Sequence, residues 1–193
     1  MSLPGFYGKI ASRGDFVTRG LAAGFTQPWD SWLASGMRTS QQQLGECWLD
    51  AYLVSPLWRF ALAAGVCGPD ATVGVLMPSI DRVGRYFPLT VAQTLEPEQP
   101  VAGLAGAADD WFSSVETLML STLNQHVGFD TFVAGLTKLR PLPVKTCEPV
   151  ASEGASLWWG KDEEGNVRAV KRCQGLPDPR HFGSCLLGLG AEV

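Results

Sequence analysis

The sequence predicts an α/β sandwich, in which helices cover both faces of a mixed, partly antiparallel sheet. Three runs rich in β-branched and aromatic residues follow one another between residues 57 and 95, and such clustered strands are typical of an antiparallel part of a sheet. Apolar residues at helical spacing precede this group and resume after residue 109. Helices on both sides of the strands along the chain are enough to cover both faces of one sheet.

The first elements are expected to be a strand and then helical segments. Residues 6–10 combine aromatic and β-branched side chains and are followed by a loop, as at the end of a strand. Thr26 is a capping candidate, and Pro28 suits the first helical position, so a helix is expected to begin there. The helical pattern breaks near Gly45 and then resumes, which fits two consecutive helices or one kinked helix.

Residues 57–62, 71–77 and 89–95 are predicted strands. Pro78 and Pro88 lie between the last two, and proline cannot donate a hydrogen bond to a neighbouring strand. Strand pairing should therefore stop between the two prolines, which leaves residues 79–87 as a displayed loop.

The second half of the chain is expected to alternate surface connections with short elements. The predictions are a linker over 96–108, a helix capped by Asp109 or Asp110, a helix capped by Asp130, a hairpin formed by 156–160 and 167–171, and a last helix around 182–187.

Composition indicates one soluble cytoplasmic domain over residues 1–193. Hydrophobic residues make up 46% of the chain and charged residues 18%, and no apolar run is long enough to span a bilayer. The N-terminus has no signal-peptide pattern, and five widely spaced cysteines suit free thiols in a reducing compartment. A net charge of −4 without a basic run argues against nucleic acid and anionic membranes as partners.

Motifs that carry chemistry are absent from the sequence. It contains no P-loop, no dinucleotide fingerprint and no GxSxG elbow, and its two histidines have no metal-ligand spacing. We therefore expect no enzyme activity, no metal and no cofactor. A hydrolase alternative would need Ser12 or Ser79 to be activated by an acid or by His126.

Two short stretches concentrate the charge of the first half of the chain. They are ASRGDFVTRG, residues 11–20, and SIDRVGRY, residues 79–86. Their side chains could pair with each other and fix the loops, or bind a carboxylate, a phosphate or an acidic loop of a partner. Both readings stay open, and the candidate binding residues are Ser12, Arg13, Asp15, Arg19, Ser79, Asp81, Arg82, Arg85 and Tyr86.

Four segments together resemble the TagF family, also called ImpM, of type VI secretion-associated proteins. They are FYGKIASRGDFVTRGL, QPWDSWL, SPLWRFALAAGVCG and GVLMPSIDRVGRYFPLT. The similarity covers residues 5–95, and the 96–193 half matches loosely. Family members typically carry proline before Ser-Arg-Gly-Asp-Phe, where this chain has Ala11.

This resemblance implies a three-layer α/β/α fold and a cytoplasmic accessory protein. Such proteins restrain type VI secretion after translation, and they are thought to bind the forkhead-associated scaffold protein of the system. The resemblance implies no catalytic activity. The alternative function is a sensor that binds an anion or a nucleotide through the same Arg and Asp loops.

Overall fold

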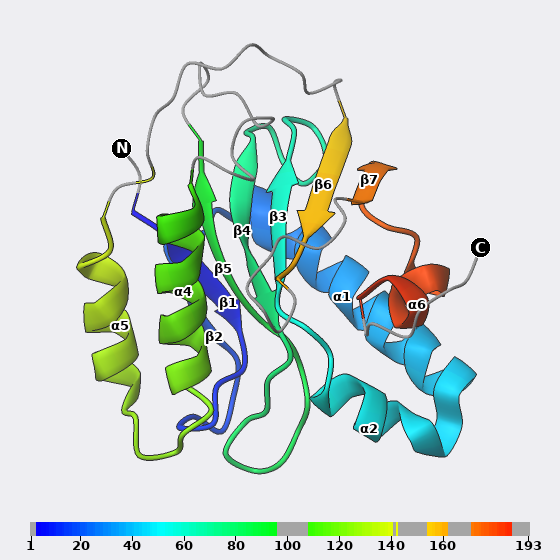
Figure 1. The fold of residues 1–193 in the computed structure, drawn as a ribbon, viewed down its shortest axis with the longest axis horizontal. Coiled ribbons are helices and arrows are strands. Elements are labelled where there is room, and N and C mark those ends of the chain that lie inside the picture. Colours follow the sequence, from blue (N-terminus) through cyan, green and yellow to red (C-terminus); the bar gives the residue numbers. More distant parts are fainter. Residues whose placement is uncertain (1–2, 96–107, 141, 143–153, 162–170, 187–193) are drawn as a thin grey trace.

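A computed structural model describes residues 3–95, 108–140, 142, 154–161 and 171–186. In this part of the chain, seven strands form one sheet in the order β2-β1-β5-β4-β3-β6-β7 (Figure 1). Their bounds are β1 Gly5–Gly8, β2 Val17–Arg19, β3 Trp58–Leu62, β4 Thr72–Met77, β5 Leu89–Thr94, β6 Ala155–Trp159 and β7 Lys171–Gln174.

The predicted α/β fold is confirmed, but the sheet is not mixed. Every neighbouring pair among the described strands is antiparallel. β3, β4 and β5 form a meander, and β1 joins β5 antiparallel before turning back into β2. Antiparallel neighbours need no helical crossover. The helices therefore precede and follow the strand group in the chain instead of alternating with it.

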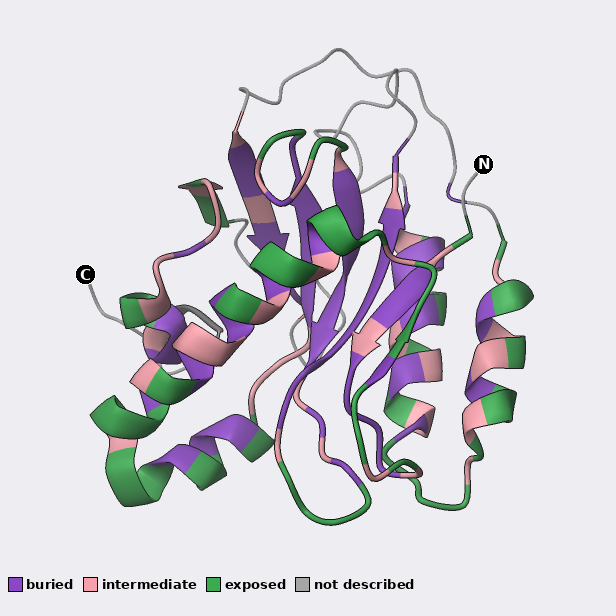
Figure 2. Cartoon of the chain, turned by 180° about the vertical axis from the view of Figure 1, so that it is seen from behind, coloured by how far each residue is buried: buried purple, intermediate pink, exposed green. Residues whose placement is uncertain are grey.

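Helices pack on both faces of this sheet. One face carries α1 (Ala23–Leu44), α2 (Trp48–Leu53) and α6 (Phe182–Leu186), and the other carries α4 (Asp109–Ser121) and α5 (Phe129–Thr137). Successive strand residues point to opposite faces, so Phe60 packs with the α1 side and Ala61 with the α4 side. The strands between the two helical layers are consequently buried on both faces (Figure 2).

The start of α1 differs from the prediction. The helix begins at Ala23, and Pro28 lies inside it. The Ala22 carbonyl accepts the N–H groups of Phe25 and Thr26, both at 3.0 Å, so Thr26 is already helical instead of being its cap. The break after α1 is real. A 3₁₀ turn, Gly45–Cys47, separates α1 from α2 and begins at Gly45 with a φ of 54°, which glycine adopts readily.

Other boundaries also need correction. The short edge strand β2 was not predicted, and neither aspartate caps the next helix, because Ala108 precedes α4 without a side-chain cap. Gly128, not Asp130, precedes α5. The predicted hairpin is confirmed as the β6–β7 pair, with its second strand shifted to Lys171–Gln174. Residues 96–107 and 162–170, expected as linker and turn, lie outside the described residues.

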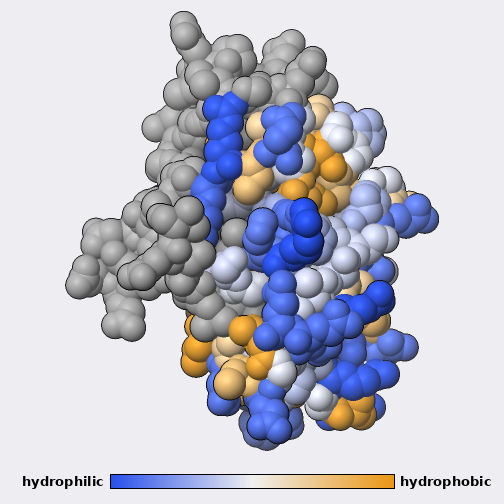
Figure 3. All heavy atoms as spheres, turned by 90° about the vertical axis from the view of Figure 1, so that its right-hand side faces the viewer, coloured by the Kyte–Doolittle hydropathy of each residue, from blue (hydrophilic) through white to orange (hydrophobic). Residues whose placement is uncertain are grey.

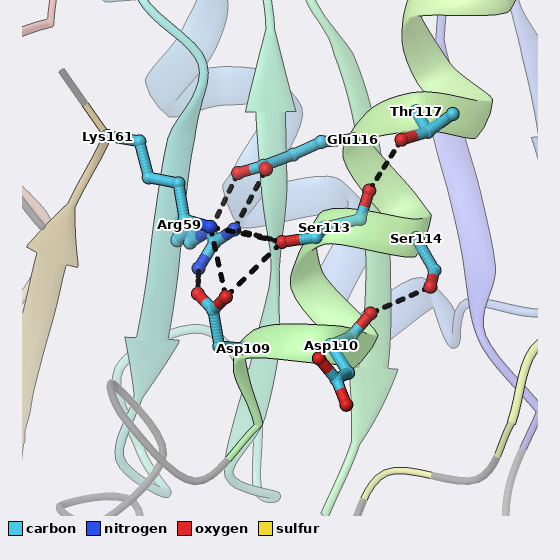
Figure 4. A network of polar contacts seen from close by, with 8 residues as sticks. All are labelled: Arg59, Asp109, Asp110, Ser113, Ser114, Glu116, Thr117 and Lys161. Atoms are coloured by element: carbon cyan, nitrogen blue, oxygen red, sulfur yellow. Dashed lines mark hydrogen bonds and ion pairs between the residues drawn. The ribbon is translucent and has the colours of Figure 1, made fainter. Parts of the chain in front are cut away.

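One fully buried cation ties α4 to the sheet (Figure 4). Arg59, on β3, is 0% exposed and holds Glu116 through two hydrogen bonds, Nε to Oε1 at 2.6 Å and Nη2 to Oε2 at 2.8 Å. Its Nη1 donates to Asp109, and its Nη2 also donates to Ser113 at 3.1 Å. Lys161 Nζ lies 3.0 Å from the other Asp109 oxygen. Both turns of α4 that face β3 are thereby fixed by charge.

This pairing changes the protonation equilibria of the network. The hydrogen bond from Arg59 is the largest cause that holds the pKa of Asp109 below its ordinary value. Burial alone would lower the pKa of Arg59, but the hydrogen bonds and charges of Glu116 and Asp109 together raise it. The guanidinium is charged at every pH at which the protein folds. Asp109 is a ligand of this cation, which explains why it does not serve as a helix cap.

Replacing Arg59 by leucine should therefore destabilise the fold strongly. The change leaves Glu116 and Asp109 without their buried counter-charge, and losing one partner of a buried pair costs about 3–5 kcal/mol. Both carboxylates keep some access to water, with side-chain exposures of 16% and 41%, so a loss near the lower end of that range is expected. Urea denaturation measures it. Arg38→Leu, on the exposed side of α1, is the control, and an equal loss in both variants would contradict the clamp.

Candidate functional site

The two charged loops lie at one end of the sheet and touch each other. Because β1 pairs with β5, the segment that leaves β1 runs beside the loop between β4 and β5 (Figure 1, bottom). The Arg82 N–H donates to the Arg13 carbonyl at 2.8 Å, and the Arg85 guanidinium donates to the Gly14 carbonyl. The two stretches singled out in the sequence thus form one surface.

The carboxylate of Asp81 is the centre of this arrangement. Asp81 is 2% exposed, and its Oδ2 accepts hydrogen bonds from Lys9 Nζ at 3.0 Å and from Arg85 Nε at 2.7 Å. Its Oδ1 accepts the backbone N–H groups of Val83 at 3.0 Å and Arg85 at 2.9 Å. One side chain therefore joins the end of β1 to the turn of the second loop.

The same donors determine the charge state of Asp81. Burial by itself would raise the pKa of this carboxyl group. Hydrogen bonds from the Arg85 backbone, Lys9, the Arg85 side chain and the Val83 backbone outweigh it and hold the pKa well below the ordinary range. Asp81 is therefore ionised at neutral pH and neutralises the ammonium group of Lys9, whose side chain is only 7% exposed.

Ser79 and Tyr86 also support the loop from within. The Ser79 hydroxyl donates to the Lys9 carbonyl at 2.7 Å, and the Tyr52 hydroxyl bonds both the N–H and the carbonyl of Ser79 at 2.9 Å. Tyr86 pairs with Ile80 across the loop, and its ring contacts those of Tyr52 and Trp48 edge to face. Ser79, Asp81, Arg85 and Tyr86 thus make contacts that shape the loop.

The first loop leaves its basic side chains differently placed. The Arg13 guanidinium lies 4.6 Å from the centre of the Phe129 ring, and Arg19 approaches the same ring at 5.6 Å. Asp15 accepts the N–H of its neighbour Phe16 at 2.8 Å. Among the described residues, no carboxylate forms an ion pair with Arg13 or Arg82. Ser12 has a buried hydroxyl oxygen without a hydrogen-bond partner in the same set.

These side chains border an open groove of about 630 Å³, here called the arginine groove. Its lining combines the first loop, the edge strand β2, the tip of the second loop and the start of α5, namely Arg13, Gly14, Asp15, Phe16, Val17, Thr18, Arg82 and Phe129. Guanidinium groups bind carboxylates and phosphates through paired hydrogen bonds, and an arginine stacked on a ring keeps those donors available. The groove is therefore suited chemically to an anionic group.

Metal and thiol chemistry have little support in the described part of the chain. No group of three His, Cys, Asp or Glu side chains there could hold a metal ion. His126 lies exposed in the turn after α4, and burial raises the pKa of the Cys67 thiol to about 12. No helix within the described ranges is long and apolar enough to cross a membrane.

Sequence reasoning missed Lys9 and Arg59. A single lysine inside the apolar run FYGKIA is the signal that could have identified a buried cation, since such a lysine needs a counter-charge. Arg59 likewise stands within the apolar run LWRFAL. In both cases the carboxylate partner lies at least 50 residues further along the chain, at Asp81 and at Asp109 and Glu116.

Comparison with known proteins supports the resemblance noted in the sequence. The sequence model of the TagF N-terminal domain, described as type VI secretion system-associated, matches residues 5–139. The crystal structure of PA0076 from Pseudomonas aeruginosa PAO1 is similar, with 47% sequence identity and a TM-score of 0.88, over 98% of this chain and 96% of that one. No curated protein matches. The family match thus extends well beyond the 5–95 segment.

Replacing Asp81 by asparagine should lower the melting temperature at neutral pH, because the Lys9 ammonium then stays buried without a counter-charge. The pKa of Asp81 is lowered in the folded state, so its contribution is complete above the unfolded pKa of about 4 and declines as pH falls below it. The difference in melting temperature between wild type and variant should therefore stay constant from pH 7 to 5 and shrink in stronger acid.

Asp15→Asn is the matched control for this measurement, because Asp15 is exposed and its side chain accepts one neighbouring N–H. It should leave the melting temperature nearly unchanged. A pH-independent difference between wild type and Asp81→Asn would show that the lost interaction is steric and not electrostatic.

Proposed function

Because the chain belongs to the TagF family of type VI secretion-associated proteins, we propose that it is a non-enzymatic cytoplasmic accessory protein that represses this system after translation. It does so by binding a component of the system, such as the forkhead-associated scaffold protein. Binding alone can account for repression if the bound component is withheld from assembly.

The observation that carries this proposal is the division of labour between the two loops. Asp81 and Arg85 spend their charges on holding the loops together, whereas the exposed Arg13 and Arg82 have no carboxylate partner among the described residues. Loops fixed by a rigid scaffold that display unpaired charged side chains are common sites of recognition. The arginine groove is the surface that we assign to the partner.

Charge reversal at the groove tests this assignment. The double variant Arg13→Glu/Arg82→Glu should lose most of its binding to the scaffold protein in a pulldown, because like charges would then face the partner's acidic groups. Its melting temperature should stay close to that of the wild type, since neither guanidinium takes part in an ion pair of the described fold. Arg85 is left intact because it supports the loop.

Lys138→Glu is the matched control. Lys138 is exposed and follows α5, whereas Phe129 of the groove begins that helix, so nine residues and about 13 Å separate them. This variant should bind as the wild type does. Full binding by the folded double variant would remove the groove from the proposal.

A sensor of anions or nucleotides remains a second candidate, supported by the two unpaired guanidinium groups that line one open groove. A ligand that binds only the folded state raises its melting temperature. Inorganic phosphate, ATP and GTP at millimolar concentration should then raise the melting temperature of the wild type and leave that of Arg13→Glu/Arg82→Glu unchanged. Equal behaviour of both proteins with all three probes would reject the sensor.

A further inference from the structure

An apolar pocket of about 230 Å³ adjoins the second charged loop. It lies between the end of α2, that loop and the end of α4, and it is lined by Tyr52, Leu53, Ser55, Leu57, Met77, Pro78, Ser79, Ile80, Tyr86, Leu120 and Leu123. Only Ser55, Ser79 and the two tyrosines bring polar side chains to it, and the Ser79 backbone and the Tyr52 hydroxyl already bond each other. The pocket therefore offers contact area more than hydrogen bonds.

Exposed hydrophobic side chains gather around this pocket. Leu53, Leu120 and Leu123 line it and are 59%, 48% and 44% exposed. Val54 at the end of α2 and Val83 in the loop are 78% and 64% exposed. Figure 3, seen from the side of α2 and α6, shows hydrophobic surface at the bottom, where α2 lies. Large exposed apolar side chains that cluster in this way mark interaction sites.

The size of the pocket restricts what it can hold. Sites for drug-sized ligands and cofactors usually measure about 300–1,000 Å³, so this pocket is small for such a molecule. It suits a single large apolar side chain. Protein interfaces are typically anchored in this way, by a few aromatic or aliphatic residues seated in pockets with near-neutral contacts around them.

The charge beside the pocket specifies the partner further. Ile80 and Tyr86 line the pocket, and Arg82, between them in the same loop, lines the arginine groove. The Ile80–Tyr86 pairing and the bond from Arg82 to Arg13 hold pocket and groove in a fixed relation. A segment anchored in the pocket therefore meets two guanidinium groups that have no acidic partner in the described part of the chain.

We propose that this end of the molecule binds an acidic amphipathic segment of a partner protein. The segment inserts a large apolar side chain into the pocket and places carboxylates against Arg13 and Arg82. This inference rests on the proposed function in that the partner is a protein, but it does not depend on which component of the secretion system supplies the segment.

Site-specific photo-crosslinking of the full chain tests it. Benzoylphenylalanine replaces Leu123, at the rim of the pocket, and in a separate control replaces Lys138, in cells that carry the secretion cluster. Mass spectrometry then identifies the cross-linked peptide. We expect a cross-link from position 123 that is absent from position 138, to a segment that contains Leu, Ile, Phe, Trp or Met together with an excess of Asp and Glu.

The outcomes separate the two proposals. Such a segment in the scaffold protein supports both, and one in another protein supports this inference while rejecting the scaffold as partner. No specific cross-link at position 123, or a basic or wholly polar segment, overturns the inference. In that case the pulldown with Arg13→Glu/Arg82→Glu still decides the proposed function.

A pair of variants adds a quantitative check with the captured partner. Leu123→Asp and Leu123→Lys both remove the apolar contact at an exposed position, and they differ in charge. The dissociation constant should rise at least about fivefold for Asp relative to Lys, because only Asp repels an acidic segment. Equal weakening by both variants, or a stronger effect of Lys, would contradict an acidic partner.

Discussion

The buried carboxylate of Asp81 is the constraint on which the functional end of this molecule depends. It accepts donors from the exit of β1 and from the turn after β4, two segments that are separated by more than 60 residues along the chain. A buried charge is tolerated when it is paired and fully hydrogen-bonded, and Asp81 meets both conditions. With this group in place, the backbone contacts between the loops need no further support from their exposed arginines.

A second buried charge cluster has a comparable role at the α4 layer. Arg59 fixes the first two turns of α4 against β3, and the opposite end of α4 carries Leu120, with Leu123 just beyond it. The placement of the pocket wall therefore depends on an ion network two to three helical turns away. Both clusters use residues that the proposed interface leaves untouched, so stability and recognition rest on different side chains.

Local patterns were sufficient for much of this architecture. The prolines at 78 and 88 correctly delimited the displayed loop, and the shared Arg, Asp and Gly content of the two stretches correctly indicated one surface. The start of α1 was misplaced because Thr26 and Pro28 carry capping signals that are also tolerated in the first two turns of a helix. The roles of Lys9, Arg59 and the pocket depend on strand register and helix packing, which local spacing does not encode.

The interlocked loops also bear on how a partner would be recognised. Association is weakened when flexible segments must become ordered, and each immobilised side chain or loop segment adds to that cost. Here the bonds from Arg82 to Arg13 and from Arg85 to Gly14 fix the backbone before any partner arrives. The surface is thus a preformed template: candidates are selected by how well they already fit it, and slight changes in loop geometry would alter selectivity before they alter folding.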